Sequence, residues 1–135
     1  MQKLIINTDG GSRGNPGPAG IGVTFSDSDG TVLAKFKEYI GEATNNVAEY
    51  RALILALEKA KDFECDEIEC RLDSELVVKQ LHGAYKVKDE KMKPLYTKVQ
   101  ELIFFKPVKF VHVRREFNKE ADALVNAALD EHLIK

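Results

Sequence analysis

The sequence predicts an α/β fold: a five-stranded mixed sheet, with an antiparallel hairpin at one edge and parallel strands beyond it, flanked by helices. Two observations predict this class. Apolar residues alternate with a period of two early in the chain, which is typical of half-buried strands. Farther along, short apolar runs alternate with stretches of helical spacing, as in strands joined by helices. A chain of 135 residues is long enough for one hydrophobic core, so we interpret 1–135 as a single domain.

The first third of the chain predicts three strands. The first covers 3–8 and ends in a turn at Asp9-Gly10-Gly11, because Asp before two glycines is typical of turns. Alternating apolar residues predict a second strand at 21–26. The turn sequence Asp27-Ser28-Asp29-Gly30 then brings the chain back as a third strand, at 32–40.

The rest of the chain predicts four helices and two strands. A helix at 46–61 carries two apolar stripes, so we expect it to pack against the sheet and against other helices. Pro94 suits the first turn of a later helix. The other expected elements are a strand at 68–72, a short helix at 74–81, a strand at 108–113 and a last helix with Ala121, Leu124, Val125, Ala128 and Leu129 on its apolar face. Tyr50 and the pair Phe104-Phe105 are expected in the core.

Composition narrows the class of protein. The run Leu4-Ile5-Ile6 is too short for a signal peptide or a membrane span. Cys65 and Cys70 have neither zinc-site spacing nor the density of a secreted scaffold. We therefore expect a cytoplasmic protein with reduced thiols and no membrane contact. Because the net charge is −2, any binding of nucleic acid must depend on local basic patches and be weak and sensitive to salt.

Four acidic residues stand at the predicted ends of strands or starts of helices: Asp9, Glu49, Asp73 and Asp122. Each has an ordinary structural explanation when taken alone. Asp9 is a good turn residue, and Glu49 follows Asn46 at the spacing of a capping box. Asp73 suits the N-cap of the next helix, and the helix dipole favours Asp122 in a first turn.

Together the four acids predict a metal centre. Asp9 and Asp73 are expected to end neighbouring central strands, and ligand sites of α/β sheets gather beyond strand ends. Converging carboxylates repel one another unless cations neutralise them. Oxygen ligands without His or Cys indicate Mg²⁺ or Mn²⁺, and two such ions can activate water for cleavage of a phosphodiester.

Motifs along nearly the whole chain resemble the type 1 ribonuclease H family. They are Thr8-Asp9-Gly10-Gly11-Ser12, Asn15-Pro16-Gly17-Pro18, Thr44-Asn45-Asn46 with Glu49, Asp73-Ser74, and Asn118 with Asp122. The resemblance implies a ribonuclease H-like fold and an endonuclease that hydrolyses the RNA strand of RNA–DNA hybrids, leaving 5′-phosphate and 3′-hydroxyl ends. It also implies that Asp9, Glu49, Asp73 and Asp122 are the catalytic, metal-binding carboxylates.

The resemblance extends to residues that would contact the substrate: Gly10, Gly11, Asn15, Thr44, Asn45, Asn46 and Ser74. Asparagine amides both donate and accept hydrogen bonds, so they can read the 2′-hydroxyl that separates RNA from DNA. Glycines allow backbone N–H groups to approach phosphates closely. The implied partner is an RNA–DNA hybrid, with duplex RNA left open and no obligate protein partner inferred.

Two of the chain's departures from many family members concern loops. The stretch 81–88 is short and the chain has no tryptophan, which indicates a subtype without the long basic insertion, or handle. Lys86, Lys88 and Lys91 are expected to form a smaller basic patch. Where relatives carry a mobile histidine loop, His112, Arg115 and Glu116 are the candidates for proton transfer or phosphate contact.

Other classes of function remain alternatives at this stage. A catalytically weak or silent hybrid-binding module would keep the fold but would tolerate amides at the four acidic positions. A 3′→5′ exonuclease typically places two acids at i and i+2 of the first strand, whereas Gly11 occupies the second position here. A module that binds a small phosphorylated ligand would use the glycine loop but leave Glu49 and Asp122 without a role.

Overall fold

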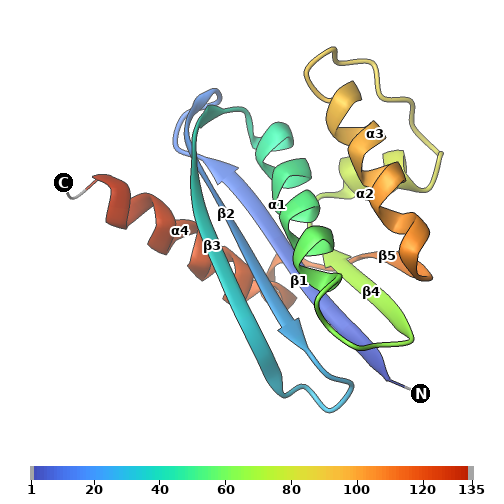
Figure 1. Cartoon of the computed structure of the whole chain (residues 1–135). Coiled ribbons are helices and arrows are strands. Elements are labelled where there is room, and N and C mark those ends of the chain that lie inside the picture. Colours follow the sequence, from blue (N-terminus) through green and yellow to red (C-terminus); the bar gives the residue numbers. More distant parts are fainter. Residues whose placement is uncertain (1, 134–135) are drawn as a thin grey trace.

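The computed structural model describes residues 2–133 (Figure 1). The strands are β1 (Lys3–Ser12), β2 (Gly17–Ser26), β3 (Val32–Ala43), β4 (Glu67–Leu72) and β5 (Val108–His112). The helices are α1 (Asn45–Ala60), α2 (Glu75–Leu81), α3 (Lys93–Leu102) and α4 (Lys119–Leu133), with two 3₁₀ turns, η1 (Ile103–Phe105) and η2 (Arg115–Phe117).

The five strands form one mixed sheet in the order β3-β2-β1-β4-β5. β1 and β2 pair antiparallel, as do β2 and β3, whereas β4 runs parallel to both β1 and β5. Helix α1 covers one face of the sheet, with α3 packed against α1 and α2 against β4 and β5, and α4 crosses the other face behind β2 and β3 (Figure 1). The predicted fold class is confirmed, and β1 is the central strand.

The turn predicted at Asp9-Gly10-Gly11 is wrong, because β1 continues through it to Ser12. Asp9 pairs with Gly22, and Ser12 pairs with Ala19, so the antiparallel ladder overrides the local turn preference. On its other side, β1 is paired with β4 only as far as Thr8. Asp9 therefore lies inside a strand, one residue beyond the last parallel pair, where the neighbouring strand β4 has ended.

The hydrophobic core lies mainly between the sheet and α1. Tyr50 is fully buried there, as predicted, and its hydroxyl donates to Gln80 Oε1 at 2.6 Å. The prediction that Phe104 lies in the core is wrong. Its side chain is 88% exposed, because η1 turns it away from the core. Phe105 packs against the core, as predicted. Cys70 is buried and Cys65 half-buried, and both thiols are free.

The connection between α2 and α3 consists only of residues 82–92, so the described part of the chain has no long insertion at this position. This agrees with the handle-less subtype. Lys86, Lys88 and Lys91 lie in this connection, and all three are exposed. Within 2–133, no helix is both long and apolar enough to cross a membrane.

Candidate active site

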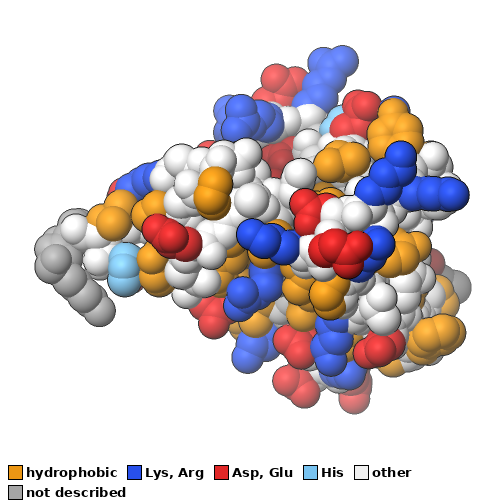
Figure 2. Space-filling model, turned by 90° about the horizontal axis from the view of Figure 1, so that it is seen from above, with side chains coloured by type: hydrophobic (Ala, Val, Ile, Leu, Met, Phe, Trp, Pro, Cys, Tyr) orange, Lys and Arg blue, Asp and Glu red, His pale blue; other side chains and the backbone are white. Residues whose placement is uncertain are grey.

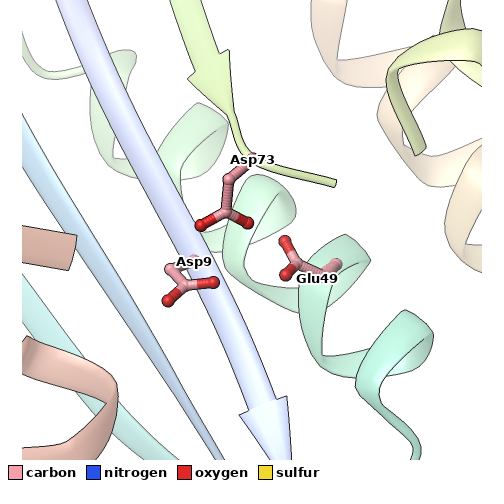
Figure 3. Close-up of side chains that lie close together, drawn as sticks. All are labelled: Asp9, Glu49 and Asp73. Carbon is pink, nitrogen blue, oxygen red and sulfur yellow. The ribbon is translucent and has the colours of Figure 1, made fainter. Parts of the chain in front are cut away.

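Three carboxylates from separate elements converge beside the central strand. Asp9 projects from β1, Asp73 directly follows β4, and Glu49 comes from α1 (Figure 3). One oxygen atom from each lies within 4.8 Å of the other two. Asp9 and Glu49 are each 7% exposed, and Asp73 is half-buried. We call Asp9, Glu49 and Asp73 the inner trio.

A glycine on β1 allows α1 to bring Glu49 into this cluster. A Cβ atom at Gly10 would stand 2.3 Å from both the carbonyl carbon and the carbonyl oxygen of Ala48, so only a residue without a side chain permits this approach. Ala48 is the residue before Glu49 in α1. The contact thus places the backbone that carries Glu49 directly against the residue that follows Asp9.

A second glycine performs the same role for α4 on the opposite face. A Cβ atom at Gly22 would lie 2.3 Å from the carbonyl oxygen of Ala121. Gly22 is the pairing partner of Asp9, and Asp122 follows Ala121 in the first turn of α4. Asp122 is exposed and stands outside the 4.8 Å cluster, although its charge and hydrogen bonding help to raise the pKa of Asp9.

The structural explanations considered for Glu49 and Asp73 are wrong. The N-cap of α1 is Thr44, whose hydroxyl accepts from the Val47 backbone N–H at 3.2 Å, so Asn46 and Glu49 do not form a capping box. The N-cap of α2 is Ser74, whose hydroxyl accepts from Val77 N–H at 3.3 Å. The carboxylates of Glu49 and Asp73 are therefore free to serve the cluster.

The electrostatics of the inner trio are those of a site built for a cation. The pKa of Asp9 is raised from 3.8 to about 7, mainly because the side chain is buried and secondly because Asp73 carries a negative charge nearby. Burial, followed by the charges of Asp9 and Asp73, raises the pKa of Glu49 well above its usual range, against a smaller lowering by the Gly10 backbone N–H. Crowded acids of this kind are unfavourable without a neutralising partner.

The ligands present fit a hard divalent cation. All donor atoms are carboxylate oxygens, the type that such ions prefer. Glu49 Oε2 is buried and has no hydrogen-bond partner among the described residues. A buried acceptor without a donor is costly, and a bound cation would satisfy it.

The acids open into a cavity of about 490 Å³. It brings together all four predicted carboxylates and five of the predicted contact residues: Gly10, Gly11, Asn45, Asn46 and Ser74. The other two predicted contact residues do not line it. Asn15 Oδ1 accepts from the Asn45 backbone N–H at 3.1 Å, and Thr44 caps α1, so both support the start of the helix that carries Glu49.

The structure separates the three residues of the predicted histidine loop. Arg115 in η2 lines the acidic cavity. His112 is the exposed last residue of β5 and is absent from the cavity lining. Glu116 is 3.7 Å from Arg114 and lines a different cavity, on the side of Asn7 and Thr24.

Two residues of this region were missed from the sequence as site residues, Arg13 and Asn126, and a third, Asn118, was part of a family motif but was given no role. Arg13 lines the cavity and pairs with Asp130 at 2.7 Å, which ties the β1–β2 hairpin to α4. Asn126 also lines the cavity, and its spacing of four residues after Asp122 on a helix could have indicated it. Asn118 is 2% exposed and donates to Asp73, a contact that no local pattern signals.

Charges around the site are mixed. On the face of the molecule seen from above, Figure 2 shows Lys and Arg side chains interspersed with Asp and Glu in separate small groups, without marking the acidic site. This agrees with a net charge of −2 and leaves the exposed lysines of 82–92 as one local basic group among several.

The mixed sheet carries a cluster of acids beside the end of β4, next to the central strand β1. This combination defines a ribonuclease H-like class of protein. The comparisons with known proteins agree. The family described as reverse transcriptase-like matches residues 7–128. LC11-RNase H1, solved in complex with an RNA/DNA hybrid, superposes with a TM-score of 0.92 at 48% identity, covering 96% of this chain and 99% of that one.

Two relatives extend the comparison. A ribonuclease H of Clostridium botulinum is 31% identical, over 97% of this chain and 98% of its own length. Ribonuclease HI of Halobacterium salinarum is 49% identical over 91% of this chain. This chain spans 62% of the length of that relative, and 36% of the length of the matching mycobacterial proteins. The chain belongs to the type 1 ribonuclease H family.

Proposed function

We propose that this protein is a metal-dependent endonuclease that hydrolyses the RNA strand of RNA–DNA hybrids and leaves 5′-phosphate and 3′-hydroxyl ends. The observation that carries the proposal is the inner trio: three carboxylates with oxygens within 4.8 Å, open to a cavity, on a chain of the ribonuclease H family. The relative LC11-RNase H1 has been solved in complex with an RNA/DNA hybrid, which supports the same substrate class here.

Asp9, Glu49 and Asp73 would hold divalent cations, with Asp122 completing the set from the cavity wall. The oxygen-only donors favour Mg²⁺ or Mn²⁺, and we propose two ions per site. When bound, such ions supply Lewis acidity that activates water and stabilises the leaving oxygen. The protein's own contribution is to hold four acids in place and keep Asp9 and Glu49 largely shielded from solvent.

The remaining cavity residues are suited to hold the substrate. Asn45 and Asn46 at the start of α1 would hydrogen-bond to ribose and phosphate groups, with Gly10, Gly11 and Ser74 alongside. Asn15 and Thr44 stand next to Asn45, and we propose that they extend the groove for the backbones. Arg115 is the stronger candidate for phosphate contact than His112 or Glu116, because it alone of the three lines the acidic cavity.

We further propose that the protein acts in the cytoplasm, without an obligate protein partner, and binds hybrids weakly. Two free thiols agree with a reducing compartment. The short connection with Lys86, Lys88 and Lys91 offers few positive charges to a substrate backbone. The assay below also tests whether the protein cuts duplex RNA.

The direct test is cleavage of an end-labelled RNA–DNA hybrid in Mg²⁺, Mn²⁺ or EDTA, with duplex DNA and duplex RNA as controls and Asp9→Asn alongside. We expect internal cuts in the RNA strand of the hybrid that require both the metal and Asp9. Binding of the hybrid without cutting in any metal would favour the silent binding module instead. Absence of both binding and cutting would remove the proposed substrate.

A further inference from the structure

Asn118 is almost completely buried at a junction between three elements. Its side chain is 2% exposed and lies just before α4. Its Nδ2 donates to the backbone oxygen of Thr8 at 2.8 Å and to Asp73 Oδ2 at 3.3 Å. Its Oδ1 accepts from Asn7 Nδ2 at 3.0 Å. The amide thus uses both of its N–H groups and its oxygen.

These contacts touch the surroundings of three of the four acids. Thr8 is the residue before Asp9, and its carbonyl is fixed by the first contact. Asp73 is held directly by the second. The backbone oxygen of Asn118 also accepts from the Asp122 N–H at 3.1 Å, in the first turn of α4. The fourth acid, Glu49, is placed separately by the approach of α1 to Gly10.

Asp73 needs such a restraint more than its neighbours do. Asp9 is within a paired strand and Glu49 is within a helix, so regular hydrogen bonding fixes both backbones. Asp73 stands between the end of β4 and the N-cap Ser74, in neither element. Oxygen atoms of Asp9 and Glu49 lie within 4.8 Å of an oxygen of Asp73, so these acids repel its carboxylate when they are ionised. The hydrogen bond from Asn118 Nδ2 holds the carboxylate of Asp73 against this repulsion.

The contacts of the Asn118 amide agree on which way it faces. The Thr8 carbonyl and the Asp73 carboxylate can only accept, so the NH₂ group of Asn118 faces them, and Asn7 Nδ2 supports this orientation by donating to the oxygen on the other side. Asn7 lies on β1 two residues before Asp9, on the same face of the strand. The two asparagines therefore form a chain of hydrogen bonds that ends on the carboxylate of Asp73.

We propose that Asn118, held by the Thr8 carbonyl and by Asn7, is a positioning residue that holds Asp73 in the geometry required for a divalent cation. This inference rests on the proposed function only in assuming that the inner trio binds such a cation. Residues that orient metal ligands from behind typically change metal affinity by about 10- to 100-fold when removed.

The experiment measures binding of Mn²⁺ to the protein alone, by water-proton relaxation, for the wild type, Asn118→Ala and Asn7→Ala. We expect Asn118→Ala to raise the dissociation constant about tenfold. Asn7→Ala is expected to raise it by a smaller factor, because the contacts with Thr8 and Asp73 are retained and only the support at the Asn118 oxygen is lost. Cleavage by Asn118→Ala should recover at high Mn²⁺ concentration.

A matched control separates positioning from general stability. Ala128→Gly weakens α4 at a buried site that packs near Gly20 and does not line the acidic cavity. It should lower the melting temperature in EDTA and leave the Mn²⁺ dissociation constant unchanged.

An unchanged dissociation constant for Asn118→Ala, with only a lower melting temperature, would overturn the proposal. If Asn118→Ala does not fold, Asn7→Ala decides in the same way. Because the readout is metal binding without substrate, weakened Mn²⁺ binding supports the positioning role even if no hybrid is cleaved, and a wild type that binds no Mn²⁺ overturns it.

Discussion

The inner trio and the outer part of the same cavity are held in place by different physical means. Asp9, Glu49 and Asp73 are brought within 4.8 Å by a paired strand, a helix seated on Gly10 and a buried asparagine. Asp122 and Arg115, which we call the outer rim, are exposed side chains on α4 and η2. Burial of Asp9 and Glu49 raises their pKa values, whereas the two residues of the rim are exposed to solvent.

The largest contrast is expected from removing one charge in each region. Asp9→Asn should reduce cleavage of an RNA–DNA hybrid by about 10³-fold or more, because a central ligand of the metal is lost. Asp122→Asn should cost roughly 10- to 100-fold, because its carboxylate is exposed and peripheral. Steady-state rates in Mg²⁺ measure both, with hybrid binding by each variant as the control. Equal losses of cleavage rate in the two variants would show that the inner trio and the outer rim act as one unit.

The pH dependence of stability without metal should also separate the two regions. The pKa of Asp9 is raised from 3.8 to about 7, so between these values the folded protein holds a proton that the unfolded chain has released. The stabilising contribution of this group in EDTA is therefore fully present below about pH 4 and is lost as pH rises to about 7, which lowers the free energy of unfolding by roughly 2–4 kcal/mol.

Asp9→Asn should flatten this slope and stabilise the metal-free protein at pH 8, while Asp122→Asn should leave most of the slope. Unfolding by denaturant in EDTA at pH 4, 6 and 8 measures how the free energy of unfolding depends on pH. Saturating Mg²⁺ should restore the stability of the wild type. A wild-type stability that rises between pH 4 and 7 would contradict the raised pKa of Asp9.

The close packing of α1 against Gly10 can be tested by comparing substitutions of Gly10 and Gly11. Gly10→Ala should destabilise the fold by about 1–3 kcal/mol and lower activity, because the new Cβ would lie 2.3 Å from Ala48 backbone atoms. Gly11→Ala is the matched control, since its Cβ would meet Val125 only at 3.8 Å. Thermal unfolding of both variants measures the difference. Similar stabilities would mean that α1 can shift without penalty.

Within the loop before α4, the cavity lining predicts that Arg115 matters more than His112. Arg115→Ala should reduce cleavage roughly tenfold, the value of one hydrogen bond to a charged group. His112→Ala should change it by less than about twofold, since an exposed side chain away from the cavity loses little on truncation. Cleavage assays of both variants make the comparison. A larger loss for His112→Ala would place the proton carrier at the end of β5 instead.

The smallest effect is expected at the α2–α3 connection. Converting Lys86, Lys88 and Lys91 to Gln should weaken hybrid binding a few-fold and make its dependence on salt less steep, by about 0.9 per lost phosphate contact. Lys61→Gln, an exposed change twelve residues after Glu49 at the other end of α1, is the control. Binding titrations at several salt concentrations measure it. An unchanged salt slope would assign these lysines to solvent alone.

Most elements of the fold could be predicted from local patterns. The period-two alternation at 21–26 and the turn at Asp27–Gly30 predicted the hairpin of β2 and β3, although both strands extend farther than expected. The helical spacing at 46–61 predicted α1 to within one residue at each end. The exposure of Phe104 could not be predicted, because it depends on how η1 packs against the rest of the fold.

The sequence by itself determined the strands and helices, through the periodicity of apolar residues, and supplied the four acids that the family resemblance identified. Only the tertiary structure decided that Asp9 lies inside β1, that Thr44 and Ser74 are the caps, and that Asn118 reaches Asp73. The physical reason is range. Periodicity and capping preferences act over a few residues, whereas contacts across 45 residues, such as that between Asn118 and Asp73, exist only once the sheet has assembled.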